Sequence, residues 1–88
     1  MPRGIDLVIL YRMLVCVRDS GSMNVTQLVR CVGGSASTIT RYVDLAVSWG
    51  LLEEETGRER RLRLTRKGED FLFLFSRLLA LVPELEKR

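Results

Sequence analysis

The sequence predicts a mainly α-helical fold with one small β-hairpin, and three observations support this prediction. Apolar residues recur at helical spacing along most of the chain, a Gly-Gly pair at 33–34 interrupts that spacing, and residues 51–64 alternate apolar and charged side chains around a turn. Because 88 residues can enclose only one compact core, we expect a single domain over residues 1–88. Its expected parts are a three-helix core, a hairpin and a C-terminal helix.

The first two helices are predicted from their apolar spacing and their end signals. Residues 5–18 carry apolar side chains at nearly every helical angle, and the segment DSGS then ends this helix. A second helix is expected over residues 24–32, because Asn24 followed by Gln27 has the spacing of a capping box. The glycines at 33–34 stop it and supply the left-handed backbone of a sharp turn.

A third helix is predicted over residues 35–49, with Ser35 as its N-cap and Gly50 just beyond its end. Positions 100° apart place an apolar stripe on one side, formed by Ala36, Ile39, Val43, Ala46 and Val47. The opposite side carries Ser37, Arg41, Asp44 and Ser48. We therefore expect this helix to pack with one face and to expose a polar one.

A hairpin over residues 51–64 and a last helix over residues 66–82 complete the predicted fold. The turn of the hairpin is expected at Thr56-Gly57, Thr65 can cap the last helix, and Pro83 ends it. A short helix, a tight turn, a second helix with a polar face and then a basic hairpin form a winged helix-turn-helix arrangement. The predicted fold class is therefore a three-helix core with a β-wing and a C-terminal dimerisation helix.

The predicted function is DNA binding. The formal net charge of +3 is modest, but residues 56–67 are strongly basic. Small hydroxyl side chains at a helix start let its backbone approach a phosphate, and Arg41 is long enough to reach a guanine edge or a phosphate. The candidate DNA-binding residues are Ser35, Ser37, Thr38, Thr40, Arg41, Arg58, Arg60 and Arg61.

Structural roles compete with these assignments. Ser35 alone is explained as a cap, and Arg61 and Arg63 are able to pair across the hairpin with Glu53 and Glu55. Arg58 and Arg60 lie nearer the tip, where we expect them to escape such pairing more easily. Asp44 is expected to orient Arg41 or to accept a hydrogen bond from a cytosine amino group.

Apolar side chains in the first and last helices exceed what one small domain covers, so we expect a homodimer. The candidate interface residues are Leu7, Leu10, Leu14, Phe71, Leu74, Phe75, Leu78 and Val82.

The sequence gives no sign of a metal site, a cofactor, a catalytic centre or a small-molecule effector. Cys16 and Cys31 are too few for a zinc site in a chain without histidine. No segment reads as a membrane span or a signal peptide, so we expect a cytoplasmic protein. Because disulfides are rare in the cytosol, two free thiols are favoured over a Cys16–Cys31 bridge.

The segment SASTITRYV, the following Gly50-Leu51-Leu52 and the L-x-L-T-x-K-G run from Leu62 to Gly68 resemble the winged helix-turn-helix transcriptional regulators common in archaea. The similarity extends over nearly the whole chain. It implies a DNA-binding regulator, often a homodimer joined through its terminal helices. It also implies that Ser37, Thr38, Thr40 and Arg41 lie on the reading face, and that Arg58 to Arg61 form the wing tip.

Two other functions fit the same pattern. A winged helix can serve as a protein-interaction module within a larger assembly, and Asp44 with the acidic block Glu53–Glu55 keeps this alternative open. A less selective chromosomal DNA-binding protein could be built on the same fold.

Overall fold

The computed structural model describes residues 5–55, 57 and 59–86, and these form the predicted mainly helical fold with a small sheet. The elements in chain order are α1 (Leu7–Ser20), β1 (Met23–Asn24), α2 (Val25–Val32), α3 (Ala36–Ser48), β2 (Leu52–Glu55), β3 (Arg61–Leu64), α4 (Arg66–Leu81) and the short 3-10 helix η1 (Pro83–Leu85). The winged helix-turn-helix class is thereby confirmed. The predicted turn residue Thr56 and the candidate DNA contact Arg58 lie outside the described residues.

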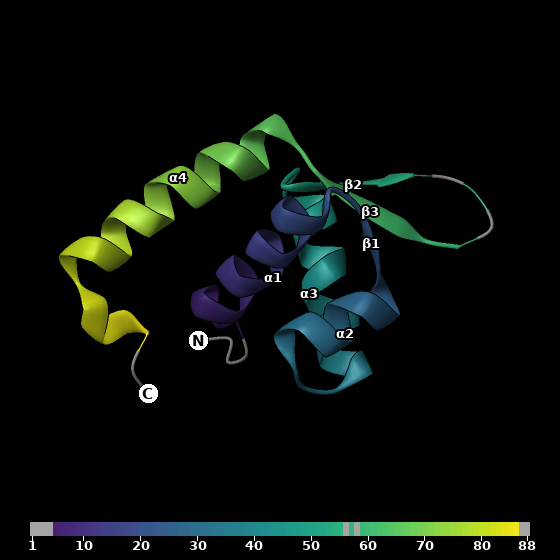
Figure 1. Cartoon of the computed structure of the whole chain (residues 1–88), viewed down its shortest axis with the longest axis horizontal. Coiled ribbons are helices and arrows are strands. Elements are labelled where there is room, and N and C mark those ends of the chain that lie inside the picture. Colours follow the sequence, from purple (N-terminus) through teal and green to yellow (C-terminus); the bar gives the residue numbers. More distant parts are fainter. Residues whose placement is uncertain (1–4, 56, 58, 87–88) are drawn as a thin grey trace.

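The three helices of the core pack around one another, while the wing and α4 project to opposite sides (Figure 1). Among the described residues, nine large side chains of the core are fully buried, and they come from α1, α2, α3 and the base of the wing: Leu10, Met13, Leu14, Val17, Leu28, Ile39, Val43, Leu52 and Leu62. A second, smaller cluster joins α4 to α1 through Val8, Phe75 and Leu79. Only part of α4 is therefore covered by the rest of the described chain.

The sheet has three strands and not the two that the sequence predicts. Its order is β1-β3-β2, and both pairings are antiparallel, with Met23 opposite Leu62 and Leu52 opposite Leu64. A strand of two residues carries no alternating pattern, so β1 gives no sequence signal. The strand β1 matters for the wing because it joins the start of α2 to β3, the central strand of the sheet.

The predicted helix caps are present. Asn24 and Gln27 form a reciprocal capping box, with side-chain to backbone distances of 2.8 and 2.9 Å. Ser35 accepts a hydrogen bond from the Thr38 N–H at 3.2 Å, and Thr65 caps α4. These bonds satisfy N–H groups that have no partner within their own helix, so they fix where α2, α3 and α4 begin.

The turn between α2 and α3 depends on its two glycines. Gly33 and Gly34 have φ values of 90° and 103°, a region that L side chains rarely adopt. The Gly33 N–H donates to the Val29 carbonyl at 2.8 Å and closes α2. The pair therefore lets α3 begin immediately after α2, as a helix-turn-helix requires.

The two cysteines form a disulfide, so the expectation of two free thiols is wrong. Cys16 of α1 and Cys31 of α2 have Cα atoms 6.3 Å apart, within the range that a disulfide can bridge. This proximity results from the packing of α1 against α2, which brings together residues 15 positions apart. In the described residues, no helix is long and apolar enough to span a bilayer.

Candidate nucleic-acid interface

Three hydroxyl groups gather at the N-terminal end of α3, and we call Ser35, Ser37 and Thr38 the hydroxyl cluster. The Ser35 oxygen lies 3.2 Å from the Ser37 oxygen and 3.0 Å from that of Thr38. Ser35 and Ser37 are exposed, and Thr38 and Thr40 are half-buried. Because the first N–H groups of a helix point outward along its positive dipole end, this position is suited to an anion such as a phosphate.

Arg41 lies on the exposed side of α3, as the helical spacing predicts. Its guanidinium carbon lies 5.8 Å from the centroid of the neighbouring Tyr42 ring. Tyr42 itself is buried, and its hydroxyl oxygen accepts a hydrogen bond from the Asp6 N–H at 2.7 Å. Tyr42 therefore anchors α3 to the start of α1, while Arg41 extends from the surface of the same turn.

Arg60 is engaged by two carboxylates, contrary to the expectation that it escapes pairing. It donates to Asp44 of α3 at 2.8 Å and also to Glu54 of β2. These hydrogen bonds, first with Asp44 and then with Glu54, raise the pKa of Arg60 above its ordinary value against a smaller opposing effect of burial. We call Asp44, Arg60 and Glu54 the Arg60 bridge. Sequence spacing could not reveal it, because Asp44 and Arg60 belong to different elements.

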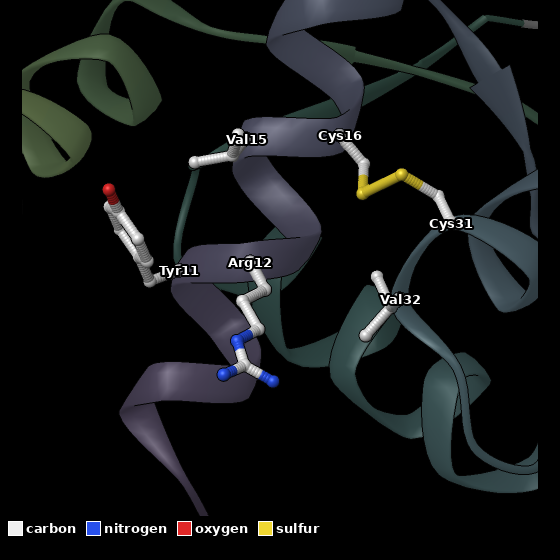
Figure 2. Close-up of a pocket in the computed structure, with 6 residues that line it drawn as sticks. All are labelled: Tyr11, Arg12, Val15, Cys16, Cys31 and Val32. Carbon is white, nitrogen blue, oxygen red and sulfur yellow. A yellow bond between two sulfur atoms is a disulfide. The ribbon is translucent and has the colours of Figure 1, made fainter. Parts of the chain in front are cut away.

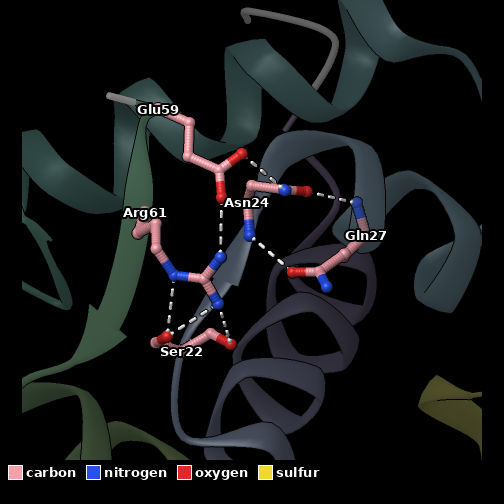
Figure 3. A network of polar contacts seen from close by, with 5 residues as sticks. All are labelled: Ser22, Asn24, Gln27, Glu59 and Arg61. Atoms are coloured by element: carbon pink, nitrogen blue, oxygen red, sulfur yellow. Dashed lines mark hydrogen bonds and ion pairs between the residues drawn. The ribbon is translucent and has the colours of Figure 1, made fainter. Parts of the chain in front are cut away.

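Arg61 is held on the side of the wing where β1 pairs with β3 (Figure 3). It donates to the Ser22 hydroxyl at 3.0 and 3.1 Å and to the Glu59 carboxylate at 2.9 Å. The second oxygen of Glu59 accepts from the Asn24 amide at 3.1 Å, so the network reaches the N-cap of α2. Of the pairings expected across the hairpin for Arg61 and Arg63, that of Arg63 is present, with Glu55 at 3.2 Å.

A second exposed surface lies on α4 and η1 and is apolar. Its most exposed members are Leu81 at 80%, Leu74 at 64% and Leu78 at 42%, and Val82 and Leu85 extend it. We call these five residues the α4 apolar face. Phe73 is also exposed, but the 100° spacing of helical residues places it on another side of α4.

Some of the predicted dimer-interface residues are buried within the chain, and others are exposed. Leu10 and Leu14 are fully buried in the core, so their assignment to an interface is corrected. Phe75 is buried too, with its ring 5.3 Å from Tyr11 and 5.5 Å from Phe71, which is half-buried. The elements α2, α4 and β3 all contact α1, which explains its buried apolar residues without a partner chain. Leu7, Leu74, Leu78 and Val82 remain exposed.

A cleft of about 310 Å³ lies between α1 and α2 beside the disulfide (Figure 2). Its lining combines aliphatic side chains with one cation and one phenol: Tyr11, Arg12, Val15, Cys16, Cys31 and Val32. Among the described residues, no group of three or more His, Cys, Asp or Glu side chains could hold a metal ion.

The core, the tight turn and the wing place this chain among winged-helix proteins, and solved structures support that class. No family model matches this chain, and no curated protein matches it. A MarR family transcriptional regulator from Silicibacter pomeroyi DSS is similar at 30% identity and a TM-score of 0.75, over 85% of this chain and 53% of that one. Another, from Silicibacter pomeroyi DSS-3, is 31% identical with a TM-score of 0.66, over 92% and 57% respectively.

A DNA-binding protein from Sulfolobus solfataricus has a similar fold, with a TM-score of 0.79 and 20% identity over 94% of this chain and 85% of that one. This chain therefore spans little more than half of the two Silicibacter regulators but most of the Sulfolobus protein. Structural relatives of this chain are thus MarR family transcriptional regulators and a DNA-binding protein.

Proposed function

We propose that this chain is a winged-helix transcriptional regulator that binds double-stranded DNA. One observation carries the proposal: the hydroxyl cluster lies at the exposed start of α3, and exposed Arg41 follows on the same helix. Phosphates bind at helix N-termini, and a bidentate arginine discriminates guanine in the major groove. The identities of 30% and 31% with the two Silicibacter regulators support this function.

In the proposed complex α3 enters the major groove and the wing lies over the adjacent backbone or minor groove. The hydroxyl cluster and Thr40 contact phosphates, and Arg41 contacts a base edge. Arg58 is the wing cation that we assign to DNA. Arg60 and Arg61 act through the contacts with Asp44, Glu54, Ser22 and Glu59 described above. No cofactor, effector or catalytic step is part of the proposal.

We further propose that two copies of the chain associate through the α4 apolar face. Helical positions 100° apart place Leu74, Leu78 and Leu81 within about 60° of one another, beside the stripe that packs on α1. A groove of about 290 Å³ between Leu7, Leu78 and Leu85 continues this surface toward the start of α1. A two-fold dimer would cover the face and present two α3 helices to a palindromic site.

We also propose that the chain is of the archaeal type; the fold that it shares with the Sulfolobus DNA-binding protein, over 85% of that protein's length, agrees with this proposal. A regulator of chromosomal DNA works inside the cell, so the proposed function implies an intracellular location. The protein-interaction module remains a second candidate, because Asp44 and the acidic residues of β2 lie beside the proposed reading surface.

The first prediction concerns Arg41. In a salt series with mixed genomic duplex DNA, the protein should bind with an affinity that falls steeply as salt rises. The variant Arg41→Ala should lose about 1–3 kcal/mol of discrimination between preferred and random duplexes, because the bidentate base contact is removed. Fluorescence anisotropy with labelled duplexes measures both quantities.

Arg77→Ala is the matched control, because it removes the same charge from an exposed position on α4, where Arg77 lies over Phe73. It should leave sequence preference unchanged. A folded protein that binds no duplex even at low salt would contradict the regulator and favour the protein-interaction module.

The second prediction concerns the dimer. The double variant Leu74→Glu, Leu78→Glu should sediment as a monomer of 10.1 kDa, while the unaltered protein should sediment at about twice that mass. Two buried carboxylates without partners would oppose association. Ala80→Glu is the control, because it adds a charge to an exposed position on another side of α4. An unaltered protein that stays monomeric at micromolar concentration would contradict the proposed dimer.

A further inference from the structure

The Arg60 bridge joins three parts of the proposed DNA-binding surface. Arg60 lies just before β3, Glu54 lies on β2, and Asp44 lies on the exposed side of α3. The guanidinium uses Nη2 for Asp44 at 2.8 Å and Nε for Glu54. Because a guanidinium is planar and its donors have fixed directions, two carboxylates bound through different nitrogens restrain it more than one does. The contact therefore fixes the wing relative to α3.

The charges of the Arg60 bridge do not favour a direct contact with phosphate. Arg60 carries one positive charge, and Asp44 and Glu54 carry one negative charge each, so the sum at neutral pH is −1. The Arg60 side chain is 31% exposed and that of Asp44 is 62% exposed. A phosphate that approached the remaining N–H groups of Arg60 would meet the negative charges of both carboxylates.

The opposite side of the wing is held by an independent set of contacts. Arg61 binds Ser22 and Glu59, and Glu59 accepts from Asn24 at the start of α2 (Figure 3). The wing is thus fastened to α2 on one side and to α3 on the other. Arg60 and Arg61, two of the arginines that the sequence assigns to DNA, make these contacts within the protein.

We propose, building on the DNA-binding function above, that Asp44 is a positioning residue for DNA binding. Through Arg60 it sets the angle of the wing against α3, and Arg60 acts as the bridge and not as a phosphate contact.

The two possible roles of Arg60 give opposite results when Asp44 is changed to Asn. If Arg60 contacted phosphate, Asp44→Asn would leave Arg60 paired with Glu54 alone and remove a repelling charge, so DNA would bind more tightly. If Arg60 is the bridge, Asp44→Asn loosens the wing and DNA binds more weakly. An exposed ion pair contributes little to folding stability, so the variant should remain folded.

The experiment measures DNA affinity for Asp44→Asn, Arg60→Gln and the double variant, with Glu53→Gln as the matched control. Glu53 is also an exposed carboxylate of β2, and no ion pair of the described residues involves it. Asp44→Asn and Arg60→Gln should each weaken binding about 3- to 10-fold, and the double variant should be no weaker than Arg60→Gln alone. Glu53→Gln should bind as tightly as the unaltered protein or more tightly.

Amide hydrogen exchange in the DNA-free protein supplies a second, independent measurement. The amides of β2 and β3 should exchange about 3- to 10-fold faster in Asp44→Asn than in Glu53→Gln. Tighter or unchanged DNA binding by Asp44→Asn would overturn the proposal, and so would unchanged exchange. If the unaltered protein bound no DNA, the regulator proposal would fail, whereas the exchange rates would still decide whether Asp44 fixes the wing.

Discussion

Removal of the Cys16–Cys31 disulfide should lower the free energy of unfolding by about 3 kcal/mol. The two cysteines are 15 positions apart, and closing a loop of that length restricts the unfolded chain by about this amount. Leu28 is the one fully buried residue of α2, and the partly buried valines of that helix also pack on the core, so the disulfide adds a covalent link to a helix with few buried side chains. Urea unfolding of the double variant Cys16→Ala, Cys31→Ala measures the difference directly.

A thiol reductant supplies the control for this prediction. Addition of a dithiol should lower the urea midpoint of the unaltered protein and leave that of the double variant unchanged. An unaltered protein whose midpoint does not respond, although free thiols are detected after reduction, would show that helix packing alone holds α2 in place.

Local signals explain why the fold class could be predicted from the sequence. Asn24, Ser35 and Thr65 each satisfy an N–H within three residues, and the glycines at 33–34 adopt the backbone that only glycine adopts easily. These effects operate within one turn of chain, so the residue types themselves reveal them. The hydroxyl cluster was found for the same reason.

The errors concern contacts between elements. Cys16 meets Cys31, and Arg60 meets Asp44, only because separate elements pack side by side. Periodicity correctly gave α1 apolar residues on several sides, but it could not tell that other elements of the same chain cover Leu10 and Leu14. The burial of a face depends on the arrangement of the helices, which no local pattern contains.

Replacement of Gly68 by alanine should destabilise the protein by about 1–3 kcal/mol. A Cβ at Gly68 would overlap the carbonyl oxygen of Leu51 and lie 2.6 Å from Cδ1 of Leu64. The clash cannot be relieved by a flexible side chain alone, because the Leu51 oxygen belongs to the backbone and accepts the Thr65 N–H at 3.1 Å. Thermal or urea unfolding of Gly68→Ala tests the prediction.

The contacts around Gly68 give a physical reason for the L-x-L-T-x-K-G motif that runs from Leu62 to Gly68. Thr65 caps α4 and donates to the Gly50 carbonyl, and Lys67 donates to the Trp49 carbonyl at 2.8 Å. These two bonds hold the start of α4 against the end of α3, and that approach leaves no room for a side chain at Gly68. The junction therefore fixes the helix that carries the proposed dimer surface relative to the helix that carries the proposed DNA-reading surface.

Helix propensity alone predicts that Gly68→Ala stabilises the protein, so the sign of the change in unfolding free energy distinguishes the two explanations. Alanine is favoured over glycine within a helix by about 1 kcal/mol, so a stabilised Gly68→Ala would show that α4 does not lie this close to Leu51. Gly57→Ala is the control, because a Cβ there meets nothing within 4 Å and the change should stay within about 0.5 kcal/mol. A destabilised Gly68→Ala beside an unaffected Gly57→Ala would establish that the junction of α3, the wing and α4 is closely packed, and that its geometry requires glycine.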